Sequence, residues 1–441
     1  MQRFAARLRA GESRYSAAMA WEHSDRRDLN DEVHARPPLR IAEPALVTHL
    51  AYQTGEQGAG RDFDHLTSLC RQFAAPLPPA GTRQWLIEAS DRLIRWERHT
   101  EFTTLTHVIA DPDPAKPWPE TPRAIEALME TLPAPCLVAV NLRIAAGTDQ
   151  AGSDRLATSF GINDLVGSTL GGGDAEAWTD FRVAPDGFSR ILIRNRTLSA
   201  GRLGRMVQRL LEIETYRMMA LLGLATARST GAQLARMERQ LADIVSRTAI
   251  DGADDNDHKL LDELTGLAAE SVALASRSRY RFSATAAYAD LVEDRLGELR
   301  EGRIEGYQRI GVFLERRFRP AIKTCAAALR RQDELAQGIA QASNMLRTRV
   351  DVKLEEQNGA LLRAMESRSR AQLRIQQAVE GLSVFAITYY LLALLKIVAD
   401  GLFPEGPEHR VLAAIAVPVI LAAVWLSVRR LRRAFAGHHA E

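Results

Sequence analysis

The sequence is poor in cysteine and has no N-terminal apolar segment of the kind that directs secretion. Its three cysteines, Cys70, Cys136 and Cys325, lie far apart, so they form neither a disulfide framework nor the close pairs of a zinc knuckle. The first 21 residues carry positive charge but no apolar core of secretory length. We therefore expect a reducing compartment and a cytoplasmic N-terminus.

An excess of one charge is also missing, and so are the familiar catalytic motifs. The net charge is +2 over 441 residues, which does not indicate nucleic-acid binding. There is no G-x-S-x-G sequence, and Gly171–Gly173 is not followed by the lysine of a phosphate-binding loop. Nothing in the sequence therefore requires an enzyme, and the expectation is a non-enzymatic protein.

Proline is absent between Pro185 and Pro320, and this gap divides the chain. Fourteen of the eighteen prolines and five of the six tryptophans precede residue 200. Because proline interrupts helices and collects at turns, the early part is typical of mixed α and β structure and the later part of long helices. We predict an α+β cytoplasmic domain over residues 1–200, a helical bundle or stalk over 201–381, a transmembrane hairpin over 382–428, and a basic cytoplasmic tail over 429–441.

The first 200 residues alternate between strand-like and helix-like segments. Turn signals at residues 89–91 and 185–187 predict two hairpins. The pattern favours an α+β sandwich in which helices cover one face of an antiparallel sheet. The predicted strands are Leu46–Gln53, Arg83–Glu88, Arg92–Ile109, Cys136–Ile144, Trp178–Val183 and Phe188–Arg194, and the predicted helices are Arg61–Phe73 and Pro122–Glu130.

From Leu203 onward the apolar residues follow a helical period. This period predicts an antiparallel bundle or coiled coil. Its expected helices are Leu203–Leu221, Gln233–Val245, His258–Leu299, Tyr307–Phe318 and Asn344–Gly381.

The last of these helices carries a seam with heptad-like spacing, from Val350 to Leu382. Polar residues interrupt the seam at Asn358, Arg368 and Gln372. One interpretation is a bundle helix in which the polar residues fix the register. The other is self-association, in which the three polar residues form rings around a common axis.

Two apolar runs follow, Leu382–Ala399 and Val411–Val428. Each is 18 residues long, enough to span a bilayer. Arginines precede the first run and follow the second, whereas the connecting turn is acidic, so both chain ends should lie in the cytoplasm. We predict an inner-membrane protein with two spans. Glu380 lies at the inner mouth of the first span, where it would meet a permeating cation or form an interfacial hydrogen bond.

A possible metal site comes from histidines and carboxylates near the predicted strand Arg92–Ile109. Glu97, His99 and Glu101 alternate along that strand and would share one face. Together with Glu32 and His34 they could bind a divalent metal ion if the segments meet in space. The alternatives are a solvated strand face and an extended segment that docks on the sheet.

Six runs of the sequence are distinctive: Leu29–Pro37, Trp96–Phe102, Asp180–Arg182, Gln208–Arg217, Leu346–Val352 and Val379–Tyr390. Together they resemble the DUF3422 family, a bacterial family of uncharacterised membrane-anchored proteins. The resemblance covers nearly the whole chain and implies a soluble part and a C-terminal membrane hairpin, but no activity. A more distant architectural similarity is to the CorA-type cation channels, although their Gly-Met-Asn signature is replaced here by Ala399-Asp400-Gly401.

Three functional hypotheses follow. The first is a non-enzymatic homo-oligomer that is held by the lipid bilayer and presents its α+β domain to a cytoplasmic protein partner. The second is a CorA-like ion channel or transporter, with Glu380 and the polar seam near the pore. The third is a metal-dependent hydrolase that uses the histidine and glutamate residues named above.

Overall fold

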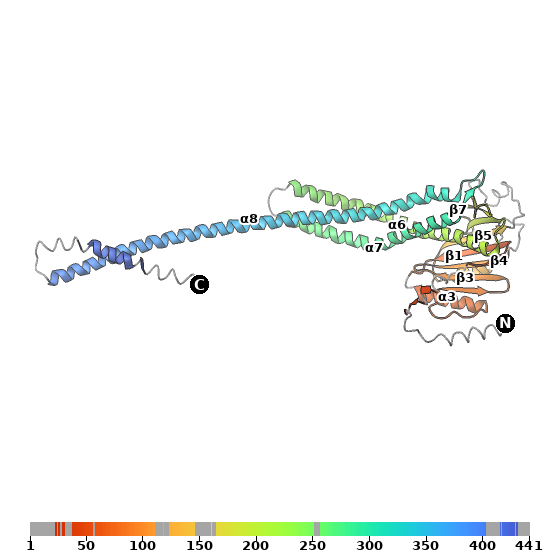
Figure 1. Ribbon diagram of the computed structural model, residues 1–441, viewed down its shortest axis with the longest axis horizontal. Helices are drawn as coiled ribbons and strands as arrows, with labels where there is room; N and C mark the ends of the chain where they lie inside the picture. The colour runs from red at the N-terminus through yellow and green to blue at the C-terminus, as the bar shows by residue number, and fades with distance from the viewer. Residues whose placement is uncertain are drawn as a thin grey trace. The chain divides into compact units, whose positions relative to one another are not determined.

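The computed structural model describes residues 23, 25–26, 29–30, 38–55, 58–110, 118, 123–145, 160, 165–250, 256–402, 415, 417–427 and 429–430. Among these residues it contains one nine-stranded sheet and the five helices named below (Figure 1). The α+β domain followed by long helices is confirmed. The strands are β1 (Ala45–Tyr52), β2 (Gln84–Glu88), β3 (Arg92–Arg98), β4 (Thr103–Ala110), β5 (Cys136–Ala145), β6 (Val166–Leu170), β7 (Ala175–Val183), β8 (Ser189–Asn195) and β9 (Gly302–Arg303). The helices are α3 (Ala59–Gln72), α4 (Arg123–Glu130), α6 (Ala200–Ile250), α7 (Asn256–Glu298) and α8 (Ile310–Leu402).

The strands are ordered β2-β3-β4-β1-β5-β8-β7-β6-β9. Every pair is antiparallel except β5 with β8, which is parallel, so the prediction of a fully antiparallel sheet was wrong. Parallel neighbours cannot be joined by a tight turn, and here β6 and β7 come between β5 and β8 in the sequence.

Helices pack on both faces of the sheet, whereas one covered face was expected. In β1, Leu50 faces a core formed with Leu66 of α3 and Ile125 of α4. Val47, which points the opposite way because strand side chains alternate, packs in the cluster that contains α6. The sheet therefore separates two cores, and β1 contributes to each of them.

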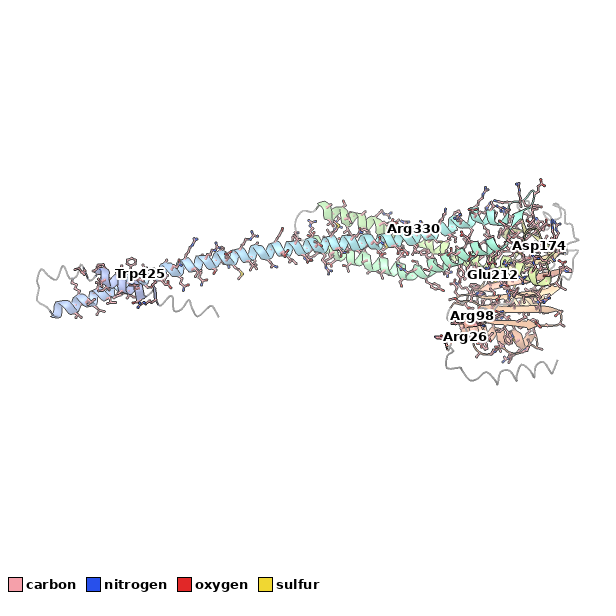
Figure 2. The ribbon with its side chains drawn as sticks, in the orientation of Figure 1. Arg26, Arg98, Asp174, Glu212, Arg330 and Trp425 are labelled. Carbon is pink, nitrogen blue, oxygen red and sulfur yellow. The ribbon has the colours of Figure 1, made fainter. Side chains whose placement is uncertain are left out.

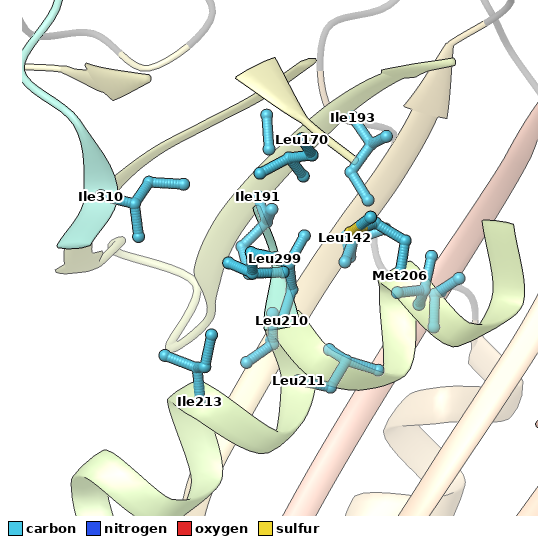
Figure 3. Packing of buried hydrophobic residues seen from close by; sticks show 14 of the residues in the cluster. Leu142, Leu170, Ile191, Ile193, Met206, Leu210, Leu211, Ile213, Leu299 and Ile310 are labelled. Carbon is cyan, nitrogen blue, oxygen red and sulfur yellow. The ribbon is translucent and has the colours of Figure 1, made fainter. Parts of the chain in front are cut away.

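The larger core lies between the sheet and the first turns of α6 (Figure 3). The apolar residues of helical spacing that begin at Leu203 form its helical side, and all of those drawn in the figure are buried. Burying each large apolar side chain stabilises the fold by roughly 1.5–3 kcal/mol. This packing fixes α6 against the centre of the sheet, where the polar cluster described below is located.

The predicted long strand Arg92–Ile109 was wrong, because the structure divides it into β3 and β4. The turn between them is closed by a hydrogen bond from the His99 N–H to the Phe102 carbonyl, 2.8 Å long. The segment contains no glycine, proline or asparagine, so the turn carries no local sequence signal. The hairpin of β2 with β3 is confirmed, with Trp85 opposite Trp96.

The chain divides into two compact units, residues 1–250 with 262–341, and residues 251–261 with 342–441. Within the first unit, α6, α7 and α8 form a bundle in which α7 is antiparallel to both other helices. Hydrogen bonds join Thr285 of α7 to the Ala220 carbonyl of α6, and Gln332 of α8 to Ser278 of α7. The predicted antiparallel packing of these helices is confirmed.

Two helix ends were predicted that the structure does not contain. α6 continues through the Ser229–Gly231 region, where the hydroxyls of Ser229 and Thr230 hydrogen bond to the Thr226 carbonyl within the helix. α8 continues through Pro320, so the predicted helices Tyr307–Phe318 and Asn344–Gly381 belong to one helix. Proline removes one backbone hydrogen bond, and packing within the bundle preserves the helix.

Candidate functional site

The three predicted ligands from the β3 region occupy different structural positions. Glu97 lies in β3 and forms an ion pair with Arg95, 3.0 Å between Nε and Oε2, with both side chains buried. His99 and Glu101 belong to the turn after β3. The His99 ring stacks on Phe102 with 4.3 Å between ring centroids, so Glu97, His99 and Glu101 do not share one strand face.

Glu101 is buried and forms an ion pair with Arg281 of α7. Tyr288, two helical turns further along α7, has its pKa raised by burial and by the charge of Glu101. Its ring stacks on Tyr216 of α6, with 5.8 Å between centroids. The β3–β4 turn is therefore fixed to both α6 and α7.

Between this turn and α6 lies a small polar cavity of about 30 Å³. That volume accommodates one or two water molecules and excludes an organic substrate. Its lining comes from β1, β3, β4, the β3–β4 turn and α6. The lining residues are His49, Arg95, Glu97, His99, Phe102, Thr104, Thr106, Gln208, Leu211, Glu212, Thr215 and Tyr216.

His49 links the sheet to α6 across this cavity. Its Nδ1 is 2.8 Å from the Thr106 hydroxyl and its Nε2 is 3.0 Å from the Thr215 hydroxyl. Burial, and then the positive charge of Arg95, lowers the pKa of His49 to about 3. The imidazole is therefore neutral at neutral pH, with one nitrogen as a donor and the other as an acceptor.

We expect His49 to make folding stability depend on pH. As the pH falls below the ordinary value of 6.5, the unfolded chain takes up a proton that folded His49 does not, so the folded state loses stability. Between about pH 7 and pH 5 the loss attributable to this residue is roughly 2 kcal/mol. Urea unfolding of the full chain in detergent, at several pH values, measures the free energy of unfolding. The decrease in that free energy toward low pH should be smaller in His49→Gln than in the natural chain.

A second buried histidine provides an independent comparison. Burial lowers the pKa of His107 to about 4. His107→Gln should therefore remove a similar part of the pH dependence of the free energy of unfolding. If His49→Gln has the same pH dependence as the natural chain, the assignment of a neutral, buried imidazole at residue 49 is wrong.

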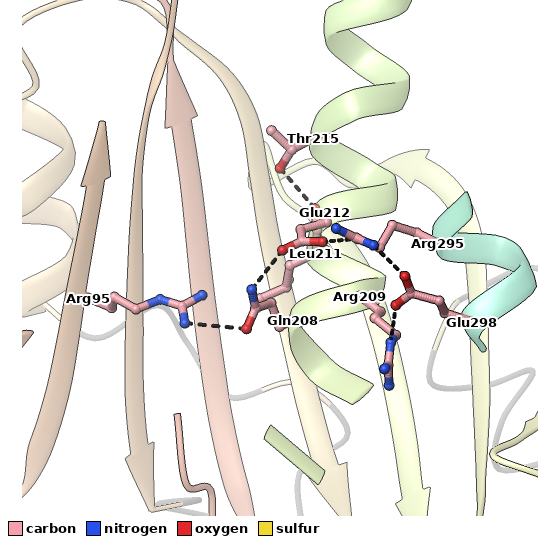
Figure 4. A network of polar contacts seen from close by, with 8 residues as sticks. All are labelled: Arg95, Gln208, Arg209, Leu211, Glu212, Thr215, Arg295 and Glu298. Carbon is pink, nitrogen blue, oxygen red and sulfur yellow. Dashed lines mark hydrogen bonds and ion pairs between the residues drawn. The ribbon is translucent and has the colours of Figure 1, made fainter. Parts of the chain in front are cut away.

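A polar network continues from the cavity across α6 to α7 (Figure 4). Gln208 accepts a hydrogen bond from Arg95 at 3.5 Å and donates one to Glu212 at 2.7 Å. Glu212 pairs with Arg295 of α7. Arg295 then pairs with Glu298, which also accepts from Arg209 of α6. The carboxylates are thus neutralised by arginines from other elements, an arrangement that stabilises tertiary structure.

The metal site predicted from the sequence stays a prediction. Among them, no three histidine, cysteine or carboxylate side chains are grouped as they would be around a metal ion. Glu32 and His34, the other predicted ligands, lie outside the described residues. Glu97 and Glu101 are each paired with an arginine, which competes with a cation for the same oxygens.

The predicted seam residues all lie on α8 within the second unit. Asn358, Arg368 and Gln372 are exposed, and Glu380 is half-buried. The apolar seam residues between them are exposed as well: Leu361 retains 61% of its accessible surface and Ile375 retains 66%. The second unit therefore presents a helix with an uncovered apolar seam.

The C-terminal part of α8 is long and apolar enough to cross a membrane, and its apolar stretch is almost entirely unburied. Leu382 and Phe385 are exposed by 73% and 68%, and along much of the second unit the side chains of α8 extend without a covering element (Figure 2). A shorter apolar helix, Val417–Ser427, is also present. Next to it, the Arg429 guanidinium lies over the Trp425 ring, 4.9 Å from the centroid.

Sequence reasoning identified Glu97 and Glu101 but not the other residues of this polar region. His49, Arg281 and Arg295 come from β1 and α7, far from β3 in sequence. A single histidine in a strand and single arginines on an amphipathic helix form no sequence motif, so the sequence alone does not mark them as members of a site. The polar residues Gln208 and Glu212 within the apolar period of α6 are a sequence signal that could have indicated where this helix meets a polar part of the sheet.

Comparison with known families gives one match. A family described as "Protein of unknown function (DUF3422)" matches residues 21–435. No curated protein matches the chain.

Proposed function

Because the chain belongs to the DUF3422 family, whose function is unknown, we propose its function from the structure: a non-enzymatic scaffold that is anchored in the inner membrane and self-associates through α8. The α+β domain would be presented to a cytoplasmic protein partner. The observation that carries the proposal is the apolar, unburied surface of α8.

The anchor is supported by the exposure of the apolar stretch. The core helix of a soluble protein buries its apolar residues, whereas only 6% of this stretch is buried. Leaving many large apolar side chains in water is strongly unfavourable, and a bilayer removes that cost. Tyr389 and Tyr390 are exposed within the stretch, and Lys396 lies near its outer end, where its amine reaches the lipid headgroups.

The proposed topology has two spans, with both chain ends in the cytoplasm. The helix Val417–Ser427 would belong to the second span, and Trp425 with Arg429 would lie at its cytoplasmic interface. Several arginines flank the proposed cytoplasmic ends, whereas the connecting sequence Asp400–Arg410 contains a single arginine, and the positive-inside rule assigns the arginine-rich side to the cytoplasm.

Self-association is supported by the seam that precedes the anchor. Leu354, Leu361 and Met365 are exposed at coiled-coil spacing, and covering them in a second copy of the chain would bury their apolar surface. Polar residues within the seam lower the stability of such a coil but select its register. An anchored chain also meets its copies at high local concentration.

Photo-cross-linking in intact membranes tests the proposed seam. A photoreactive amino acid at Met365, a seam position, should give covalent dimers. The same group at Ser367, on the opposite side of α8, should give few. Equal yields at the two positions, or no dimer at Met365, would contradict the scaffold proposal.

The ion-channel and metal-dependent hydrolase hypotheses stay predictions. Glu380, Asn358, Arg368 and Gln372 lie on one helix, as the channel hypothesis requires.

A further inference from the structure

A larger cavity lies elsewhere in the first unit, between β7, α6 and the start of α8. Its volume is about 370 Å³, within the range of pockets that bind small organic ligands. We call it the arginine pocket, because Arg182, Arg217 and Arg317 come from three different elements to line it. The remaining lining residues are Asp180, Phe181, Leu221, Phe313, Leu314 and Phe318.

The pocket contains a stack of aromatic rings and guanidinium groups. Phe181 of β7 stacks on Phe313 of α8, with 5.0 Å between centroids and 7° between ring planes. Arg217 lies over Phe181 at 5.2 Å, and Arg317 lies over Phe313 at 4.9 Å. A guanidinium that stacks on a ring keeps its in-plane N–H donors available for an anion.

The three arginines differ in how far the protein neutralises them. Arg217 donates from Nη2 to Glu214 at 2.7 Å, and its buried Nε has no hydrogen-bond partner among the described residues. Arg182 and Arg317 are exposed, and within the described part of the chain neither forms an ion pair. The pocket therefore carries an excess of positive charge and unused N–H donors.

The backbone at the pocket is strained. Phe181 has φ of 54°, a left-handed conformation that is unusual for a bulky residue. It occurs at a bulge in the pairing of β7 with β8 and is stabilised by a hydrogen bond from the Phe181 N–H to the Thr179 hydroxyl, 3.2 Å long. Such conformations persist where the surrounding structure enforces them, often at binding sites. Here the bulge directs the Phe181 ring onto Phe313.

We propose that the arginine pocket binds a phosphate group carried on an apolar body. Guanidinium groups bind phosphate oxygens through paired, charge-assisted hydrogen bonds, which Arg182 and Arg317 have free to form. The phenylalanine and leucine side chains of the lining would contact the apolar portion. This inference is independent of the membrane anchor and of self-association.

The test is equilibrium binding to the full chain in detergent, measured by calorimetry with phenyl phosphate as the probe. A second titration uses phosphatidic acid in mixed micelles, with phosphatidylcholine micelles as the reference. Binding of phenyl phosphate indicates a soluble organic phosphate, and binding of phosphatidic acid alone indicates a lipid headgroup. Either result supports the pocket, whereas no binding of either probe up to about 10 mM overturns it.

Matched variants locate the site. The double variant Arg182→Gln with Arg317→Gln should weaken binding by about 100-fold, because each charged hydrogen bond contributes roughly 10-fold or more. Arg316→Gln is the control, since Arg316 is an exposed neighbour on α8 that does not line the pocket. Both variants should keep the melting temperature of the natural chain, because the replaced side chains are exposed. Unchanged affinity in the double variant, or an equal loss in Arg316→Gln, overturns the proposal.

Discussion

Replacing Leu391 and Leu394 by lysine is expected to release the chain from membranes. Both residues are exposed near the middle of the apolar stretch of α8. A lysine at the centre of a spanning helix costs about 2.5–3.5 kcal/mol, so the pair costs roughly 5 kcal/mol or more. Membrane partition should then fall on the order of a thousandfold, measured as the fraction of chain that pellets after an alkaline carbonate wash.

The same change earlier in α8 provides the control. Leu354→Lys with Leu361→Lys alters two exposed seam leucines that precede the apolar stretch. This variant should remain in the washed pellet but lose the covalent dimers formed from residue 365, because two buried lysines oppose pairing. If the Leu391 and Leu394 variant also pellets like the natural chain, α8 is not the anchor.

Gly204→Ala is expected to lower the stability of the first unit sharply. A Cβ at this position would lie 1.6 Å from the backbone oxygen of Leu39, closer than any real contact. Neither the α6 backbone at Gly204 nor the backbone at Leu39 can move apart easily. Gly204 lies within α6, and the backbone after Leu39 is held by a 3.1 Å hydrogen bond from the Ile41 N–H to the Ala200 carbonyl. We expect a loss of about 3 kcal/mol in the free energy of unfolding.

Gly201→Ala, three residues earlier in α6, is the matched control. The nearest heavy atom to its added Cβ is the flexible guanidinium of Arg205, at 4.0 Å. Alanine favours the helix over glycine by roughly 0.5–1 kcal/mol, so this variant should be slightly stabilised. Thermal unfolding that shows equal melting temperatures for the two variants would contradict the close contact between α6 and Leu39.

Most elements of the fold follow from local sequence patterns, and the errors come from features that only tertiary structure determines. The hairpin at Phe188 was predictable because proline and glycine mark its turn. The turn at His99 has no such residue and is fixed instead by Glu101, which pairs with Arg281 of α7. Pro320 predicted a helix end that packing in the bundle overrides. The parallel pairing of β5 with β8 depends on strand order, which the sequence does not encode locally.

The candidate sites were less predictable than the fold. The seam and the apolar stretch of α8 follow from the spacing of apolar residues in the sequence, and the structure shows that Leu361 and Leu382 lie exposed on this helix. The polar cavity and the arginine pocket consist of single residues from distant elements. Arg182 and Arg317, for example, are 135 positions apart by number and come together only because β7 packs beside the start of α8.

The central claim is that the chain is a membrane-anchored assembly joined through α8. It is tested most directly by native mass spectrometry of the full chain released from lipid nanodiscs. The proposal predicts one discrete mass, an integer multiple of the chain mass of two or more, which shifts to the monomer when Leu354 and Leu361 are replaced by lysine. A natural chain that is recovered only as a monomer would contradict it.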